Sequence, residues 1–271
     1  MMSSPFILKK ITAGYWRASL QNPPFNLLGP EFFKGLSSIL SEVENDPNIK
    51  VIVFDSAIPD FFISHYDLQQ APSIPDEDIA NWPKMMLKLA TLPVITIAAI
   101  RGRARGAGSE FPLACDIRFG SKEKLVLSQV EVSVSLVPGG GAFEWLPRMV
   151  NRGRLLEIVC GSDEFDAETA EKYGWINRAV PDADFESFVD TFARRVASWD
   201  KDSLVEAKRL INKRYGLPTE EEFVESYQVM GKLWMNPKTG NRLNELFKAG
   251  LESDREVELR VGEVVARFPC D

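Results

Sequence analysis

Histidine and cysteine are scarce in this chain, and each scarcity excludes a class of site. The 271 residues include one histidine, His65, and three cysteines. Cys115, Cys160 and Cys270 are widely separated and form no Cys-x-x-Cys pair, so they indicate neither a disulfide framework nor a zinc motif. With a single histidine the usual metal clusters cannot be assembled, and we expect no metal site. A reducing, cytoplasmic location fits this cysteine usage best.

An excess of basic charge and a membrane-spanning segment are also missing. The net charge is −7 and the pI is near 5.1, which argues against non-specific binding to nucleic acid or to an anionic membrane. The longest apolar run, residues 92–100, is interrupted by Pro93 and Thr96 and is too short to cross a bilayer. The first ten residues hold no apolar run of signal-peptide length. We therefore expect a soluble protein that binds a small molecule.

Short apolar strands alternate with amphipathic helices in the first part of the chain. Strands are predicted at residues 6–10, 15–20, 51–54, 94–100, 116–119 and 125–127. Helices are predicted from Pro30 to the turn at 46–48, and again from Trp82, with Asn81 as the cap. A loop from Asp55 to about Tyr66 and a glycine loop over 102–108 separate these elements. This order predicts right-handed crossovers that place helices over a sheet.

From Gly140 onward the sequence is mostly helical. Helical spacing covers residues 166–172, 184–199, 202–215, 220–234, 241–249 and 253–266. We place a boundary near residues 198–203, between a core over 1–198 and a helical region over 199–271. The apolar faces of these charge-rich helices need a partner, either the core or a neighbouring subunit.

Two glutamates stand out because each lies beside glycine-rich sequence. Glu110 follows Gly106-Ala107-Gly108-Ser109, and Glu131 precedes Pro138-Gly139-Gly140-Gly141. Glycine lets a ligand approach the main chain, and burial with mutual repulsion pushes the pKa values of paired carboxyls towards neutrality and apart. Such a pair can move protons on a substrate whose carbonyl is polarised by peptide N–H groups. The structural alternatives are a surface charge for Glu110 and a turn cap for Glu131.

Four segments, in order, resemble the crotonase family, that is, enoyl-CoA hydratase/isomerase. They are the stretch from Phe62 to Leu68, the stretch from Pro93 to Ile117, the stretch from Ser128 to Gly139, and Ala170 to Asn177. Ordered agreement over roughly two-thirds of a chain is more specific than a lone motif. The resemblance implies an α/β fold with a crotonase-like ββα spiral core and a C-terminal helical trimerisation region. It also implies a homotrimer or a dimer of trimers.

The resemblance further implies a lyase that adds water to a 2-enoyl thioester. Coenzyme A would be part of the substrate, and no separate cofactor is expected. The backbone N–H groups of Tyr66 and Ala107 would hold the thioester oxygen, while Glu110 activates water and Glu131 protonates the α-carbon. The other predicted substrate-binding residues lie in the same loops: Ser64, His65, Asp67, Leu68, Gly106, Gly108, Pro138 and Gly139.

The chain departs from the family pattern in these loops. His65 and Ala107 stand where hydratases usually have glycine, and Asp60 and Gln69 stand where basic side chains often meet CoA phosphates. These departures leave the carrier of the acyl group open. Five basic residues could compensate: Arg101, Arg103, Arg105, Lys122 and Lys124.

Other interpretations stay open at this point. An isomerase, a thioester hydrolase or a β-diketone carbon–carbon hydrolase would keep the oxyanion pocket and use His65 as an added acid or base. The structural alternative for His65 is a hydrogen-bonded residue without a chemical role. A non-catalytic scaffold or RNA-binding subunit is a third hypothesis, against which the acidic composition and the acid pair count. The sequence contains no P-loop, dinucleotide fingerprint or Gly-x-Ser-x-Gly elbow.

Overall fold

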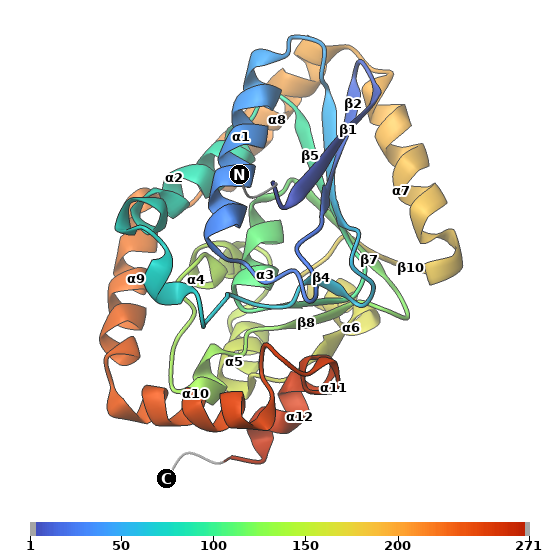
Figure 1. Ribbon diagram of the computed structural model, residues 1–271. Helices are drawn as coiled ribbons and strands as arrows, with labels where there is room; N and C mark the ends of the chain where they lie inside the picture. The colour runs from blue at the N-terminus through green and yellow to red at the C-terminus, as the bar shows by residue number, and fades with distance from the viewer. Residues whose placement is uncertain (1–3, 269–271) are drawn as a thin grey trace.

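The computed structural model describes residues 4–268, whose strands form two sheets (Figure 1). The large sheet has the order β1-β2-β3-β5-β7-β10, and the small sheet has the order β4-β6-β8-β9. The large-sheet strands are β1 (Phe6–Thr12), β2 (Tyr15–Leu20), β3 (Val51–Ser56), β5 (Ile95–Ile100), β7 (Ile117–Ser121) and β10 (Arg178–Val180). The small-sheet strands are β4 (Phe61–Ile63), β6 (Arg103–Arg105), β8 (Val126–Ser128) and β9 (Phe165–Asp166).

The helices and 3₁₀ turns of the core complete this architecture. The helices are α1 (Pro30–Asn45), α2 (Asp76–Thr91), α3 (Ala107–Glu110), α4 (Ala142–Trp145), α5 (Arg152–Gly161), α6 (Ala167–Tyr173) and α7 (Asp182–Ala197). The 3₁₀ turns are η1 (Ala71–Ser73), η2 (Phe111–Ala114), η3 (Glu131–Val134) and η4 (Leu146–Arg148). Three times in succession, the chain passes from a large-sheet strand to a small-sheet strand and then to a helix or 3₁₀ turn. The predicted ββα spiral is therefore confirmed.

The central strands β3 and β5 of the large sheet are buried on both faces, which explains their nearly continuous apolar sequence. In β3, Val51 and Val53 pack in the cluster that α7 covers, whereas Ile52 and Phe54 pack in the main core with α1 and α2. Figure 1 shows α7 on one side of the sheet and α1 and α2 on the other. Strands β2, β3, β5 and β7 run parallel. Successive side chains of a strand point to opposite faces, so a parallel strand covered on both sides is apolar throughout.

Three predictions about local structure in the first half of the chain were wrong. The loop from Asp55 to Tyr66 and the glycine loop over 102–108 contain β4 and β6, which are too short to give a periodic pattern. Helix α2 begins at Asp76, so Asn81 is not its cap, and Pro83 lies inside the helix. The acidic first turn of α2 suits the positive end of the helix dipole and outweighs the proline signal.

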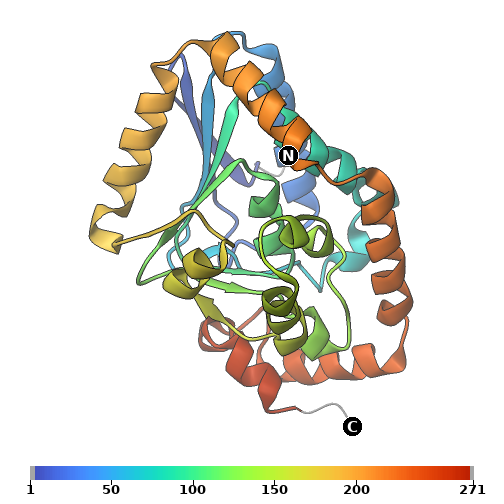
Figure 2. The same ribbon diagram turned by 180° about the vertical axis from the view of Figure 1, so that it is seen from behind.

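The C-terminal helices lie along one side of the core and beneath the small sheet (Figure 2). They are α8 (Lys201–Tyr215), α9 (Glu220–Trp234), α10 (Pro237–Ala249), α11 (Arg255–Leu259) and α12 (Val261–Ala266). The predicted single helix over 253–266 is thus divided into α11 and α12. Residues of α10 and α12 bury apolar side chains with Val134 and Leu136, so this part of the region packs on its own chain. The division at 198–203 stays a prediction.

Two observations bear on the exclusions drawn from composition. No helix among residues 4–268 combines the length and apolarity needed to cross a membrane. Cys115 and Cys160 are free thiols, and Cys270 lies outside the described residues.

Candidate active site

Glu110 is buried at the end of α3, with an exposed fraction of 2%. Its Oε1 accepts hydrogen bonds from the backbone N–H groups of Gly140 and Ala142, each at 3.0 Å. Burial raises the pKa of Glu110 to about 7; the amide of Ala142 opposes this shift, and the charge of Glu144 reinforces it. The glycine run 139–141 therefore holds a carboxylate, and it is not a cradle for a phosphate.

Glu131 begins η3, on the other side of Gly106. Its Oε1 lies so close to Gly106 that a Cβ at that position would be 2.6 Å away, and Gly106 itself has a positive φ of 51°. Its Oε2 is buried and receives no hydrogen bond from the described residues. Burial, and next the charge of Glu110, raise the pKa of Glu131 well above its usual value. The two carboxyls therefore titrate as an interacting pair, and the pKa of each lies above its usual value.

A third acid, Glu144, joins this cluster from α4 and was missed in the sequence. It is 2% exposed, its Oε1 accepts a hydrogen bond of 2.5 Å from Ser226 Oγ, and its buried Oε2 has no partner among the described residues. Burial raises its pKa. Its position three residues after Gly141 is the signal that could have found it.

The amides of Tyr66 and Ala107 are both free. Neither N–H donates to another group within residues 4–268. The carbonyl of His65 accepts from Leu28 N at 2.9 Å, and the carbonyl of Gly106 accepts from Ser109 N at 2.8 Å. In a trans peptide the C=O and N–H groups point in opposite directions, so each free N–H points away from the bond that fixes its peptide. Ala107 is also the first residue of α3, where orphan amides carry partial positive charge.

The two loops that carry these amides lie against each other. Strand β4 pairs with β6 in parallel, with Ile63 opposite Ala104, so both loops leave the small sheet at the same edge. A Cβ on Gly108 would be 2.1 Å from the carbonyl oxygen of Ile63. Only glycine permits this approach.

The predicted substrate-binding residues of the first loop bond to their own chain. Ser64 Oγ donates to Glu258 at 2.5 Å, and Leu68 N donates to Glu252 at 2.6 Å. The carboxylate of Asp67 accepts hydrogen bonds from the backbone and side chain of Gln70. These side chains shape the loop, and its free group is the amide of Tyr66.

His65 is buried and both of its ring nitrogens are occupied. Nδ1 lies 2.7 Å from the carbonyl oxygen of Tyr66, and Nε2 lies 3.1 Å from Glu258 Oε1. Its φ is not positive, so the loop accepts histidine in place of glycine without strain. Neither nitrogen is free to exchange a proton with a substrate.

The remaining predicted residues, Pro138 and Gly139, form the approach to Gly140. Pro138 is buried, and Gly139 packs closely against Met230 of α9. The carbonyl of Gly140 accepts a hydrogen bond of 2.8 Å from Trp82 Nε1 of α2. This segment is fixed at both ends, which keeps the amides that face Glu110 in place.

The arginines that could replace the missing phosphate contacts are used within the chain. Arg101 forms two 2.6 Å bonds to Asp182, and Arg103 Nε donates to the carbonyl of Leu259 at 2.8 Å. Arg105 is fully buried and binds Glu164.

Lys122, Lys124 and Asp60 lie in turns that join the two sheets, and Gln69 lies in the first loop. Lys122 pairs with Glu168 at 2.9 Å, and Lys124 is exposed. Asp60 pairs with Arg255 of α11 at 2.6 Å, and the backbone N–H of Gln69 donates to the carboxylate of Glu252. The negative charge of Asp60 is thus neutralised by the C-terminal region.

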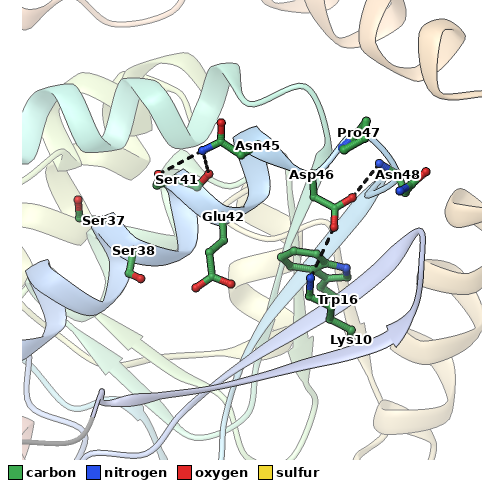
Figure 3. Close-up of a pocket in the computed structure, with 10 residues that line it drawn as sticks. All are labelled: Lys10, Trp16, Ser37, Ser38, Ser41, Glu42, Asn45, Asp46, Pro47 and Asn48. Atoms are coloured by element: carbon green, nitrogen blue, oxygen red, sulfur yellow. Dashed lines mark hydrogen bonds and ion pairs between the residues drawn. The ribbon is translucent and has the colours of Figure 1, made fainter.

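A polar groove between α1 and the β1–β2 hairpin differs from this site (Figure 3). Its volume is about 610 Å³. Lys10 lies 3.9 Å above the ring of Trp16 and 3.5 Å from Asp46. The backbone N–H of Asn48, and then the charge of Lys10, lower the pKa of Asp46. This shift is opposite in direction to that of Glu110. The coupled acids make the site around Glu110 the candidate active site.

Within residues 4–268 no three His, Cys, Asp or Glu side chains form a group that could hold a metal ion. The spiral of paired strands, with two acids beside two free amides, defines a crotonase-fold protein.

Comparison with known proteins agrees with this class. The sequence model of the enoyl-CoA hydratase/isomerase family matches residues 10–239. A crystal structure from Streptomyces avermitilis, of a protein provisionally named an enoyl-CoA hydratase, is 38% identical, with a TM-score of 0.92 and 99% of each chain covered. The chain belongs to the enoyl-CoA hydratase/isomerase family.

Curated relatives match over shorter stretches. YngF of Bacillus subtilis, provisionally named an enoyl-CoA hydratase/isomerase, is 28% identical over 72% of this chain and 75% of its own length. Mouse mitochondrial methylglutaconyl-CoA hydratase is 31% identical over 57% of this chain. The matched part spans only 50% of the length of the mouse protein.

Proposed function

We propose that this protein is an enoyl-CoA hydratase that adds water across the double bond of a 2-enoyl thioester of coenzyme A. The observation that carries the proposal is the coupled acid pair. Glu110, with a pKa of about 7, is partly ionised at neutral pH, while burial and the charge of Glu110 raise the pKa of Glu131 and favour its protonated form. A hydration needs one base and one acid at neighbouring carbons, and unequal pKa values assign these roles.

In this proposal Glu110 removes a proton from water as its oxygen attacks the β-carbon. The electrons of the double bond move onto the thioester oxygen, which receives hydrogen bonds from the amides of Tyr66 and Ala107. Each such donor contributes about 2.7–4 kcal/mol to transition-state stability. Glu131 then gives its proton to the α-carbon, and exchange with solvent restores both acids. No cofactor is required beyond the coenzyme A of the substrate.

The experiment is turnover of a short-chain 2-enoyl-CoA in water labelled with heavy oxygen. We expect a 3-hydroxyacyl-CoA that carries the label, and we expect Glu110→Gln and Glu131→Gln to abolish most of its formation. Glu168→Gln is the matched control, because Glu168 is an exposed acid that pairs with Lys122.

Other products would contradict the hydratase assignment. Migration of the double bond without label would indicate an isomerase, and release of free coenzyme A would indicate a hydrolase. Failure to turn over any enoyl thioester, under conditions where the protein is folded, would remove the proposal.

We also propose that the protein assembles as a homotrimer or a dimer of trimers in the cytoplasm. Large apolar side chains are exposed along α8 and α9: Leu210, Ile211, Tyr215, Val224, Tyr227 and Val229. Such a face is suited to burial against another subunit. Sedimentation at several concentrations tests this, and a monomer throughout would contradict it.

A further inference from the structure

Both loops that carry the free amides are tied to one short C-terminal segment, residues 252–259. The first loop meets the carboxylate of Glu258, which lies 3.1 Å from His65 Nε2 and 2.5 Å from Ser64 Oγ. Glu258 is completely buried. It also accepts a 2.8 Å hydrogen bond from the backbone N–H of Glu252.

Glu252 completes the connection to the first loop. Its carboxylate accepts the backbone N–H groups of Leu68 and Gln69, at 2.6 and 3.1 Å, and lies 3.9 Å from His65 Nδ1. The peptide that ends at the amide of Tyr66 is therefore held from two directions. The backbone N–H of Leu28 donates to the carbonyl of His65, and Glu258 of the C-terminal segment binds the imidazole ring of His65.

The second loop is tied to the same residue through the backbone. Arg105, which directly precedes Gly106 and Ala107, donates from Nη1 to the carbonyl oxygen of Glu258 at 3.0 Å. Arg103 donates to the next carbonyl, that of Leu259. Arg105 has no exposed surface, so this bond is shielded from water.

The hydrogen-bond partners of His65 define its charge. The carbonyl of Tyr66 and the carboxylate of Glu258 are both acceptors, so both ring nitrogens donate and the ring is an imidazolium. The groups that face this cation are Glu258 and Glu252 from the C-terminal segment, and the Tyr66 carbonyl from its own loop. A buried cation paired in this way holds a fixed position, because separating it from Glu258 would leave two uncompensated charges.

We propose that Glu258 is a positioning residue that holds both oxyanion amides in place, through His65 and Ser64 for Tyr66 and through Arg105 for Ala107. The segment 252–259 is then part of the active site of its own chain. This inference rests on the proposed function, because it assigns Tyr66 and Ala107 to the thioester oxygen.

The test measures how strongly the protein polarises a bound thioester. A saturated acyl-CoA with an isotopically labelled thioester carbonyl binds without turnover, and hydrogen bonds lower the infrared stretching frequency of that carbonyl. We expect a lowered frequency in the wild type and in Glu110→Gln, and partial return to the free value in Glu258→Gln. For turnover we expect kcat of Glu258→Gln to fall about 10²-fold with a much smaller change in KM, since displaced donors weaken transition-state binding most.

Two further variants keep the proposal falsifiable. Ser64→Ala removes one bond to Glu258 and leaves the ion pair, so a smaller return of the carbonyl frequency is expected even if Glu258→Gln fails to fold. Lys208→Met removes a different buried ion pair, formed with Asp116 at 2.7 Å, and should destabilise the protein while leaving the carbonyl frequency unchanged. Lys208 lies on α8, at the opposite end of the molecule from α11 (Figure 1).

The outcomes separate this inference from the proposed function. A wild-type shift that persists in both Glu258→Gln and Ser64→Ala would overturn the positioning role and leave the hydratase proposal intact. A wild type that binds no acyl-CoA, or binds it without a shift, would overturn the oxyanion assignment and this inference with it.

Discussion

A buried pair of acids, Glu110 and Glu131, contrasts with a buried ion pair, His65 and Glu258, because the carboxyl pKa values are displaced in opposite directions in the two places once burial and partners are both included. Among residues 4–268 no cation pairs with Glu110 or Glu131, and burial raises the pKa of each. Glu258 is equally buried, yet the charge and hydrogen bond of His65 outweigh the effect of burial and lower its pKa to about 2. Glu110 and Glu258 are residues of the same type, and both are almost completely buried. The partner determines whether a buried carboxyl can exchange a proton or carries a permanent charge.

The two pairs are therefore suited to different roles, proton transfer for Glu110 and Glu131 and a structural role for Glu258. An acid whose pKa is near 7 can accept and release protons at neutral pH, whereas an acid with a pKa of about 2 remains a fixed anion. Glu252, which contacts the same histidine, differs from Glu258, since burial raises its pKa despite the nearby charge.

The largest effect on activity should come from substitution of Glu110 or Glu131, the acid pair that has no cation beside it among the described residues. Glu110→Gln and Glu131→Gln should each lower kcat/KM for hydration by about 10²- to 10⁴-fold, since each removes a proton-transfer group. The free energy of unfolding at neutral pH should not decrease, because an ionisable group without a cation is removed from a buried site. Steady-state kinetics and urea denaturation of the same preparations measure both. A variant that loses stability but keeps its rate would reverse the assignment.

Substitution in the ion pair of His65 and Glu258 should instead reduce stability. Glu258→Gln should lower the free energy of unfolding by about 3–5 kcal/mol, because it leaves the imidazolium of His65 buried without an anion. The double variant His65→Gln with Glu258→Gln should recover part of this loss. Urea denaturation of the single and double variants gives the coupling between the two residues, and simple additivity would contradict the pairing.

Stability should depend on pH in a direction that each pair determines. The pKa of Glu258 is lower in the folded state, so its contribution is present above about pH 4.5 and is lost as the pH falls through 2; the amount is on the order of 3 kcal/mol. The raised pKa of His65 gives stability that is present below pH 6.5 and is lost as the pH rises through its folded-state value. Denaturation over a pH series should show an acid loss in the wild type that is weaker in the double variant. Equal acid slopes would disprove this account.

A smaller effect should come from Glu144. Its charge raises the pKa of Glu110, so Glu144→Gln should move the acid limb of the kcat/KM profile to lower pH. The acid limb reports the ionisation of Glu110, which must lose its proton before it can act as a base. A profile that does not move would show that Glu144 is uncharged over this range.

The smallest effect should come from an exposed pair. Arg101 and Asp182 form two short hydrogen bonds, yet 58% of the Arg101 side chain is exposed. Arg101→Ala should change the free energy of unfolding by less than about 1 kcal/mol, because solvent screens the interaction. Thermal denaturation measures this change, and a loss as large as that of Glu258→Gln would show that burial is not the deciding difference.

Local patterns were sufficient for much of the fold. The apolar run 51–54 predicted a strand, and the helical spacing over 166–172 predicted a helix, which the structure caps with Asp166 and Gly174. Strands β4 and β6 were missed because three residues contain too little of a period to be recognised. The start of α2 was misplaced because the rule for proline outweighed three acids that precede it.

Some residues of the candidate site could likewise be predicted from local sequence, and others could not. Glu110 could be selected because two glycines closely precede it, and Glu131 because a run of glycines begins eight residues after it; both are local signals. Glu144 could be found only weakly. The partners of His65 could not be found, since Glu252 lies in a turn between two helices and Glu258 lies in sequence that resembles any solvated helix.

The sequence by itself determined the longer strands, most of the helices and the two candidate acids. Periodicity and turn chemistry act between near neighbours, so these properties can be read along the chain. The spiral core was implied only by the resemblance of four ordered segments to the family. Only the tertiary structure decided which carboxyls have a cation, which arginines are occupied, and which segment holds the two amide loops. These properties depend on burial and on partners from distant parts of the chain, and a linear sequence does not record which distant residues meet.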